Sequence, residues 1–225
     1  MRGVLAITLV ALSALACSSS SSSGDDDAGT GFGSSSGSTS SSSGSTSSSG
    51  GTPDAGTCAT LVLKSGATAT VVARSGVAGA EWTSPADALT EDGKVASAVL
   101  DAATESQELR ITDFAFGVPA GATIKGVEVS LRRQAQGTVY DGAVTLVGLD
   151  GQTPLVKYYE PAWPKSASGV HEYGGVGEMW NSTITAADVN KSTFGVSIWV
   201  KKDPAAGPAT ATIDALRLAV YYCQQ

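Results

Sequence analysis

Apolar and polar residues alternate along much of this chain between residues 58 and 225, most clearly over residues 109–116 and 124–132. A period of two sends successive side chains to opposite faces of an extended strand, so the apolar members face a core and the charged members face water. We therefore expect three apolar sets, each sharing one face: Val127, Val129 and Leu131; Leu216, Leu218 and Val220; and Phe114 and Phe116. This pattern restricts the segment to a strand-based fold.

Further short segments are typical of strands, and Gly or Pro turn signals such as Asp92-Gly93, Asp141-Gly142 and Asp203-Pro204 separate them. Only residues 185–190 suggest a helical turn, with Thr185 as its N-cap. About nine short strands with such turns predict an all-β fold, a two-sheet β-sandwich of jelly-roll-like form. The further strand candidates are residues 60–63, 68–72, 95–100, 144–149, 155–159, 194–200 and 210–222.

Two cysteines, Cys58 and Cys223, bracket this domain. In an oxidising compartment such a pair predicts one disulfide, closing a loop of about 165 residues and contributing up to roughly 5 kcal/mol in the chain-entropy description. The bridge requires the first and last strands to be neighbours, which a jelly roll allows. The alternative is two unpaired thiols.

The chain before the domain divides into residues 1–16 and residues 17–57. The first part has a positive charge at Arg2, an apolar run over residues 3–12 and small residues before Cys17, the order of a secretory signal peptide. The apolar run is too short for a spanning helix, which needs about 20 residues. Residues 17–57 are almost entirely Ser, Gly and Thr with a few Asp, so we expect a disordered tether with an end-to-end distance of about 35 Å.

The residues before Cys17 resemble the lipobox of bacterial lipoproteins, although Ala14 and Leu15 are exchanged relative to its commonest pattern. The resemblance implies that Cys17 carries lipid and anchors the protein in the cell envelope. Ser18 after the cysteine then points to the outer membrane of a Gram-negative bacterium. The alternative is an ordinary signal cleaved near Ala16, which leaves Cys17 free.

The charge of the chain argues against nucleic acid as a partner. The chain has 14 Lys and Arg against 21 Asp and Glu, and residues 58–225 have 13 against 17, a net charge of −4. No basic cluster exceeds a pair, so we expect no nucleic-acid binding.

A larger set of motifs over about residues 75–222 resembles a β-sandwich module that recurs in secreted bacterial and phage-tail-associated proteins. The resemblance implies a sandwich fold and no known catalytic activity. It rests on Trp82-x-x-Pro-x-x-Ala-Leu, Leu109-x-Ile-Thr-Asp-Phe-x-Phe, Val118-Pro-Ala-Gly-Ala-Thr-Ile-x-Gly-Val-x-Val, Tyr173-Gly-Gly with Met179-Trp180, Ile184-Thr-x-x-Asp-Val-Asn, and Ala211-x-Ile-Asp-x-Leu-x-Leu-x-Val-Tyr-Tyr.

Three aromatic residues, Tyr158, Tyr159 and Trp163, stand outside these motifs in a Gly- and Pro-rich stretch. Planar rings stack on sugars, and long loops on rigid sandwiches often carry function. We predict a glycan site made by these three residues with Glu160 as a polar partner. The alternative is that the rings only pack.

Other chemistry has weaker support. Asp87, Asp92 and Asp214 could supply oxygen ligands to Ca²⁺, but no EF-hand spacing occurs, Asp92 also fits a turn, and Asp214 also fits an outward-facing strand position or a pair with an Arg. His171 is the only histidine, and residues 58–225 contain no Gly-x-Ser-x-Gly, so a Ser-His-Asp site is not expected. The carboxylates available for a glycosidase pair would be Glu160, Glu172 and Glu178.

These patterns predict a non-catalytic, surface-anchored binding or adhesion module without a cofactor, whose partner is a glycan or another surface protein. A structural module that assembles with other envelope or appendage proteins is the alternative, and a hydrolase is a third.

Overall fold

In a computed structural model, the structure describes residues 58–224 except residues 160 and 167. The predicted signal peptide, tether and lipid site at Cys17 lie outside these residues, and so does Glu160. Within the described part, no helix combines the length and the apolar character needed to cross a bilayer.

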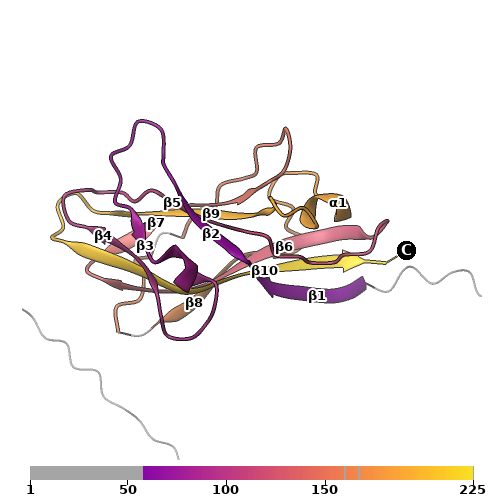
Figure 1. Cartoon of the computed structure of the whole chain (residues 1–225), viewed down its shortest axis with the longest axis horizontal. Coiled ribbons are helices and arrows are strands. Elements are labelled where there is room, and N and C mark those ends of the chain that lie inside the picture. Colours follow the sequence, from indigo (N-terminus) through magenta and orange to yellow (C-terminus); the bar gives the residue numbers. More distant parts are fainter. Residues whose placement is uncertain (1–57, 160, 167, 225) are drawn as a thin grey trace, which may run out of the picture. The chain divides into compact units, whose positions relative to one another are not determined.

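Two antiparallel sheets pack face to face and form a sandwich (Figure 1). The first sheet has the order β3 (Trp82–Thr83), β4 (Ala96–Leu100), β10 (Ala209–Cys223), β6 (Thr123–Gln136), β8 (Gly169–Val176), and β1 (Cys58–Ser65) also pairs with β10. The second sheet has the order β2 (Thr68–Val72), β5 (Glu108–Thr112), β9 (Gly195–Lys202), β7 (Val139–Val147).

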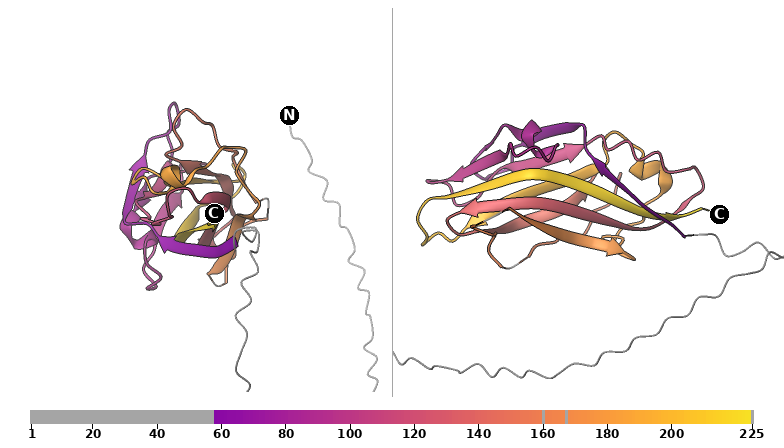
Figure 2. Two further views of the ribbon diagram at one scale, coloured as in Figure 1. Left: turned by 90° about the vertical axis from the view of Figure 1, so that its right-hand side faces the viewer. Right: turned by 90° about the horizontal axis from the view of Figure 1, so that it is seen from below.

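The connections from β4 to β10 are of jelly-roll type. Each successive strand crosses to the other sheet, so that β4, β6, β8 and β10 share one sheet while β5, β7 and β9 share the other. The end-on view in Figure 2 shows the strands arranged in two layers, and the buried apolar side chains form one cluster. The predicted all-β, two-sheet sandwich is confirmed.

The core forms where the predicted strand faces meet. Leu218 pairs with Val129 across β10 and β6, Val220 pairs with Val127, and all four side chains are fully buried. The second sheet contributes the buried faces of β5 and β9, where Leu109 lies opposite Ile198. The faces predicted from alternation are therefore the core faces.

The strand predicted over residues 109–116 is too long. Strand β5 ends at Thr112 because Asp113 and Ala115 have φ angles of 62° and 47°, in the left-handed region that a strand cannot use. The rings of Phe114 and Phe116 are still buried, with their centres 5.7 Å apart in a stacked pair. The alternation here thus reflects burial on an irregular backbone.

Two other local predictions differ from the structure. Residues 155–159 form no named strand, whereas β8 forms in a Gly-rich stretch that is not among the strand candidates of the sequence. Asp141-Gly142 is not a turn but lies inside β7, at a bulge between Asp141 and Ala143. Two short helices complete the described part of the chain: η1 (Pro85–Ala88) and α1 (Ala186–Val189).

The predicted N-cap of α1 is correct. The Thr185 hydroxyl accepts from the backbone N–H of Asp188, and the Asp188 carboxylate accepts from the Thr185 N–H, which completes a capping box.

The first and last strands of the domain are neighbours, as the cysteine pair required. Antiparallel β1 and β10 place Cys58 opposite Cys223. At the other end of β10, a turn through Asp203 and Pro204 leads back to β9, so this turn and the two cysteines occupy opposite ends of the sandwich (Figures 1 and 2).

Candidate functional site

The segment between β7 and β8 follows the edge of the second sheet. Lys157 and Val144 exchange both backbone hydrogen bonds, at 2.7 and 2.8 Å, and the Trp163 N–H donates to the Val139 carbonyl at 2.8 Å. After Trp163 the segment leaves β7 for the first sheet, where the Ala135 N–H of β6 donates to the Pro164 carbonyl at 2.9 Å. The segment therefore occupies the place of one more strand beside β7, although only one bridge forms.

A buried polar cluster holds this segment to both sheets. Asp141 of β7 accepts a hydrogen bond from Arg133 of β6, one from the Trp163 indole at 2.7 Å and one from the Tyr173 hydroxyl at 2.7 Å. It also accepts from the backbone N–H of Tyr159 at 2.8 Å. Because the Arg133 and Asp141 side chains are only 3% and 0% exposed, the pair joins the two sheets inside the sandwich.

The surroundings of this cluster shift the pKa values of two side chains, Tyr173 and His171. Burial, then the charge of Asp141, raises the pKa of Tyr173 far above its ordinary value, so its hydroxyl stays protonated and donates. Burial, then the charge of Arg133, lowers the pKa of His171 below its ordinary value. The His171 ring lies between Tyr159, at 4.0 Å between ring centres, and Tyr173, at 4.8 Å.

The three aromatic residues predicted to bind glycan have different surroundings. Trp163 is 1% exposed, and its ring lies beside the Arg133 guanidinium at 5.1 Å, so it presents no face to a ligand. Tyr159 is 42% exposed and lies on His171 at a hollow of about 200 Å³. Tyr158 is 62% exposed and lines a separate groove. The structure therefore does not bring the three together into one surface.

The groove beside Tyr158, with a volume of about 530 Å³, lies at the end of the sandwich away from Cys58 and Cys223. Tyr140 on β7 lies opposite Lys201 on β9. Both line the groove together with Tyr158, which belongs to the segment between β7 and β8. Lys202, Asp203 and Pro204 also line it. We call these six residues the Tyr140–Tyr158 groove.

Two features of the sequence belong to this groove, although no motif links them to Tyr158. Lys201-Lys202 is one of the two basic pairs of the domain, and Asp203-Pro204 marks the turn after it. Tyr140 stands next to Asp141, but only the pairing of β7 with β9 places it beside Lys201.

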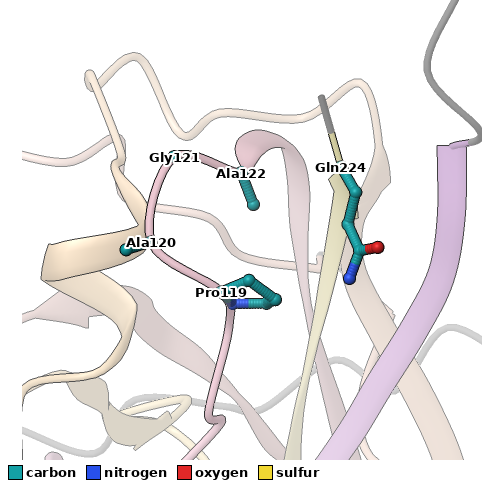
Figure 3. A pocket seen from close by; sticks show the side chains of 5 residues that line it. All are labelled: Pro119, Ala120, Gly121, Ala122 and Gln224. Atoms are coloured by element: carbon teal, nitrogen blue, oxygen red, sulfur yellow. The ribbon is translucent and has the colours of Figure 1, made fainter.

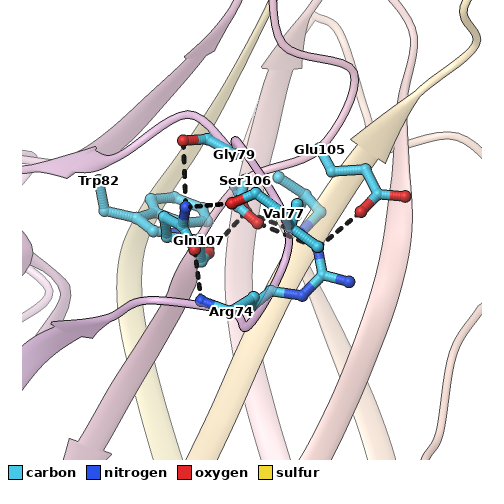
Figure 4. Close-up of polar contacts among 8 residues, drawn as sticks. Arg74, Val77, Gly79, Trp82, Glu105, Ser106 and Gln107 are labelled. Atoms are coloured by element: carbon cyan, nitrogen blue, oxygen red, sulfur yellow. Dashed lines mark hydrogen bonds and ion pairs between the residues drawn. The ribbon is translucent and has the colours of Figure 1, made fainter.

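A second polar network fixes the loop between β2 and β3 (Figure 4). The Gln107 side chain accepts from the Arg74 N–H at 2.6 Å and donates to the Val77 carbonyl at 3.0 Å, and the Trp82 indole donates to the Gln107 carbonyl at 2.9 Å. The Arg74 guanidinium pairs with Glu105 at 2.7 Å. The donors and acceptors of this network pair with one another, so its role is to hold the loop in place.

Arg74 also covers the outer face of the second sheet. Its guanidinium lies 3.5 Å from the centre of the Trp199 ring. That ring lies over Gly142, where an added Cβ would come within 1.9 Å of it. Trp199 is thus half-buried, with Gly142 and the Arg74 guanidinium both against its ring.

The three calcium candidates do not form a cation site in the structure. Asp214 accepts from the Gly93 N–H at 3.1 Å, which brings the Asp92 turn beside it, while Asp92 itself accepts from the Lys94 N–H at 3.0 Å. Asp87 lies in η1. Among the described residues, no three His, Cys, Asp or Glu side chains are grouped closely enough to hold a metal ion.

Of the carboxylates considered for hydrolysis, Glu172 lies on β8, and Glu178 follows that strand in an ion pair with Lys157. Glu178 accepts from Lys157 at 2.7 Å and from the Trp180 N–H at 2.8 Å. The hydrogen bond from Lys157 lowers the pKa of Glu178, which is opposite to the raised value that a general acid needs.

Another hollow, at the end of the sandwich near the C-terminus, offers less chemistry (Figure 3). Its volume is about 320 Å³, and it is lined by residues 119–122 together with Gln224. Its wall consists of a short turn with small side chains and the amide of Gln224, and none of these residues carries a charge or an aromatic ring.

No family model, no curated protein and no solved structure matches this chain.

Proposed function

We propose that this protein is a lipid-anchored envelope protein whose β-sandwich is a non-catalytic saccharide-binding module, with the sugar held in the Tyr140–Tyr158 groove. The observation that carries the proposal is the exposed Tyr158 ring, 62% accessible, beside Tyr140 in a groove of about 530 Å³. Apolar ring faces with a few polar groups that orient the ligand are typical of small-molecule sites. A volume of this order is in the usual range for such sites.

The position of the groove supports the proposal. Strand β10 has 15 residues, a length of about 45 Å at the usual rise per residue, and it separates the turn at Asp203 from Cys223 and its partner Cys58. A tether that enters at Cys58 would hold the opposite end of the sandwich, with the groove, away from the membrane.

A binding assay with matched tyrosine variants tests the groove. The full chain, purified in detergent, is applied to an array of oligosaccharides, together with the variants Tyr158→Ala and Tyr159→Ala. We expect Tyr158→Ala to lose the retained sugars and Tyr159→Ala to keep them, because Tyr159 faces His171 instead. The reverse result would assign binding to the hollow beside His171 and would refute the groove.

The anchor is tested separately. Cys17→Ser should release the protein from membranes into the aqueous phase of a detergent partition, because a lipid on Cys17 is the proposed attachment. Stable anchoring would involve more than one acyl chain, since a single chain binds only marginally. A variant that stays with membranes would show that the lipobox resemblance misled us.

We further propose a disulfide between Cys58 and Cys223. Opposed residues of an antiparallel pair have Cα atoms about 4.5–5.5 Å apart, inside the range that a disulfide spans. Mass spectrometry of peptides from the unreduced protein should show the two cysteines joined. Recovery of both as free thiols from protein purified without reductant would refute the bridge.

A structural role in an assembly is the second candidate, and strand β8 favours it. This strand ends the six-stranded sheet, and its side chains Val170 and Val176 are 52% and 73% exposed. An edge strand of this kind can accept a strand from another protein. If no sugar is retained on the array, crosslinking at Glu172 in the middle of β8 is the experiment that follows.

A further inference from the structure

The charges that line the Tyr140–Tyr158 groove differ in sign from the charge of the domain. Lys201 and Lys202 carry two positive charges against one negative charge on Asp203, a local balance of +1, while residues 58–225 carry −4. A local excess of one sign in a hollow attracts a ligand of the other sign.

Lys201 is the lining cation that is free to bind a ligand. Its side chain is exposed, and within the described part of the chain no ion pair or hydrogen bond occupies its ammonium. Its neighbour on one side is Tyr140, and on the other side β9 forms a bridge to Glu105. The Glu105 carboxylate already pairs with Arg74 at 2.7 Å, so it does not neutralise Lys201.

The other two charges have partners within the protein. The Lys202 ammonium donates to the Asp101 carbonyl at 2.8 Å and is 7% exposed, so it contributes charge without being able to reach a ligand. Asp203 accepts from the Ala205 N–H at 2.8 Å, which orients one carboxylate oxygen into its own turn.

We propose that the groove selects an anionic saccharide, whose carboxylate, sulfate or phosphate group binds the Lys201 ammonium while a sugar ring lies on Tyr158. The inference rests on the proposed function of the same groove and specifies its ligand class. An ammonium with three free donors is a suitable partner for any of these groups, because hydrogen bonds between charged groups are stronger than neutral ones.

The experiment uses the full chain in detergent on an array that carries uronate, sulfated, phosphorylated and neutral oligosaccharides. Wild-type protein should retain one of the three anionic classes above the neutral sugars, and that class identifies the group bound. Lys201→Gln should weaken this retention about two- to fivefold, the size expected for an exposed ion pair, and Lys201→Arg should restore it. Lys64→Gln, an exposed lysine on β1, makes the same change in net charge and should have no effect.

Ionic strength gives a second measurement. The preference for the anionic class should fall between low salt and about 0.5 M salt, since exposed charges are screened over less than 10 Å under those conditions. If neutral sugars bind as well as anionic ones and Lys201→Gln changes nothing, the charge inference is refuted and the saccharide proposal stands. If no oligosaccharide is retained at all, both are refuted.

Discussion

Replacing Asp141 by Asn tests whether the buried cluster holds the fold together. Asn has almost the same shape but no charge, so Arg133 would stay buried without its counter-ion. Asp141 also accepts from Trp163, Tyr173 and the backbone of Tyr159, and an amide has only one accepting oxygen for these donors. Removing one partner of a buried pair costs about 3–5 kcal/mol, a large share of a typical unfolding free energy of about 5–15 kcal/mol.

Urea unfolding followed by tryptophan fluorescence measures this loss, and Trp163 is one of the four tryptophans that contribute to the signal. Asp150→Asn is the matched control, since Asp150 pairs with Lys191 at 3.0 Å but its side chain is 85% exposed. The control should leave the midpoint unchanged. A loss below about 1 kcal/mol for Asp141→Asn would show that the cluster is not a main source of stability.

A double-mutant cycle separates the ion pair from the other contacts. Arg133→Met alone and Asp141→Asn alone each leave a buried polar group without its partner. The double variant should cost less than the sum of the two single variants by about 0.5–3 kcal/mol, because no unpaired charge remains. Strict additivity would mean that Arg133 and Asp141 act independently.

Three further expectations follow from burial and packing. Gly142→Ala places a methyl group against the Trp199 ring, so it should cost about 1–3 kcal/mol and shift the fluorescence of Trp199. Leu218→Ala should cost about 2–5 kcal/mol in urea unfolding, while Val176→Ala, at a 73% exposed position, should leave the midpoint unchanged. Burial lowers the pKa of His171 in the folded protein, so the unfolded chain binds a proton at this residue more readily. Stability is therefore lost as the pH falls through about 6.5, the ordinary pKa of histidine. His171→Gln should reduce the loss of stability measured between pH 7 and pH 5.

The faces of the regular strands could be predicted from the sequence because alternation is a local property. Val129 and Leu218 were placed on core faces, and both are fully buried. Neighbouring first and last strands followed from the positions of Cys58 and Cys223, since a bridge restricts which strands can be adjacent. The N-cap at Thr185 could also be predicted, because a cap and its partner lie within one helical turn.

The candidate site was only partly predictable. Tyr158 was among the predicted residues, but Tyr140 and Lys201 were not, since they come from strands joined only in the folded sheet. Trp163 was predicted to bind a ligand, but its ring is buried. Burial of the indole N–H is possible because this group donates a hydrogen bond to Asp141.

Arg133 illustrates what tertiary structure alone decided. It follows Val127, Val129 and Leu131 at the same parity in β6, so alternation places its charge in the core without naming a partner. Locally, Asp141-Gly142 has the composition of a turn. Only the crossing of the chain between sheets brings Asp141 to Arg133 and turns that dipeptide into a bulge. Periodicity encodes which face a side chain takes, but a buried charge is stable only against a partner that the packing of two sheets supplies.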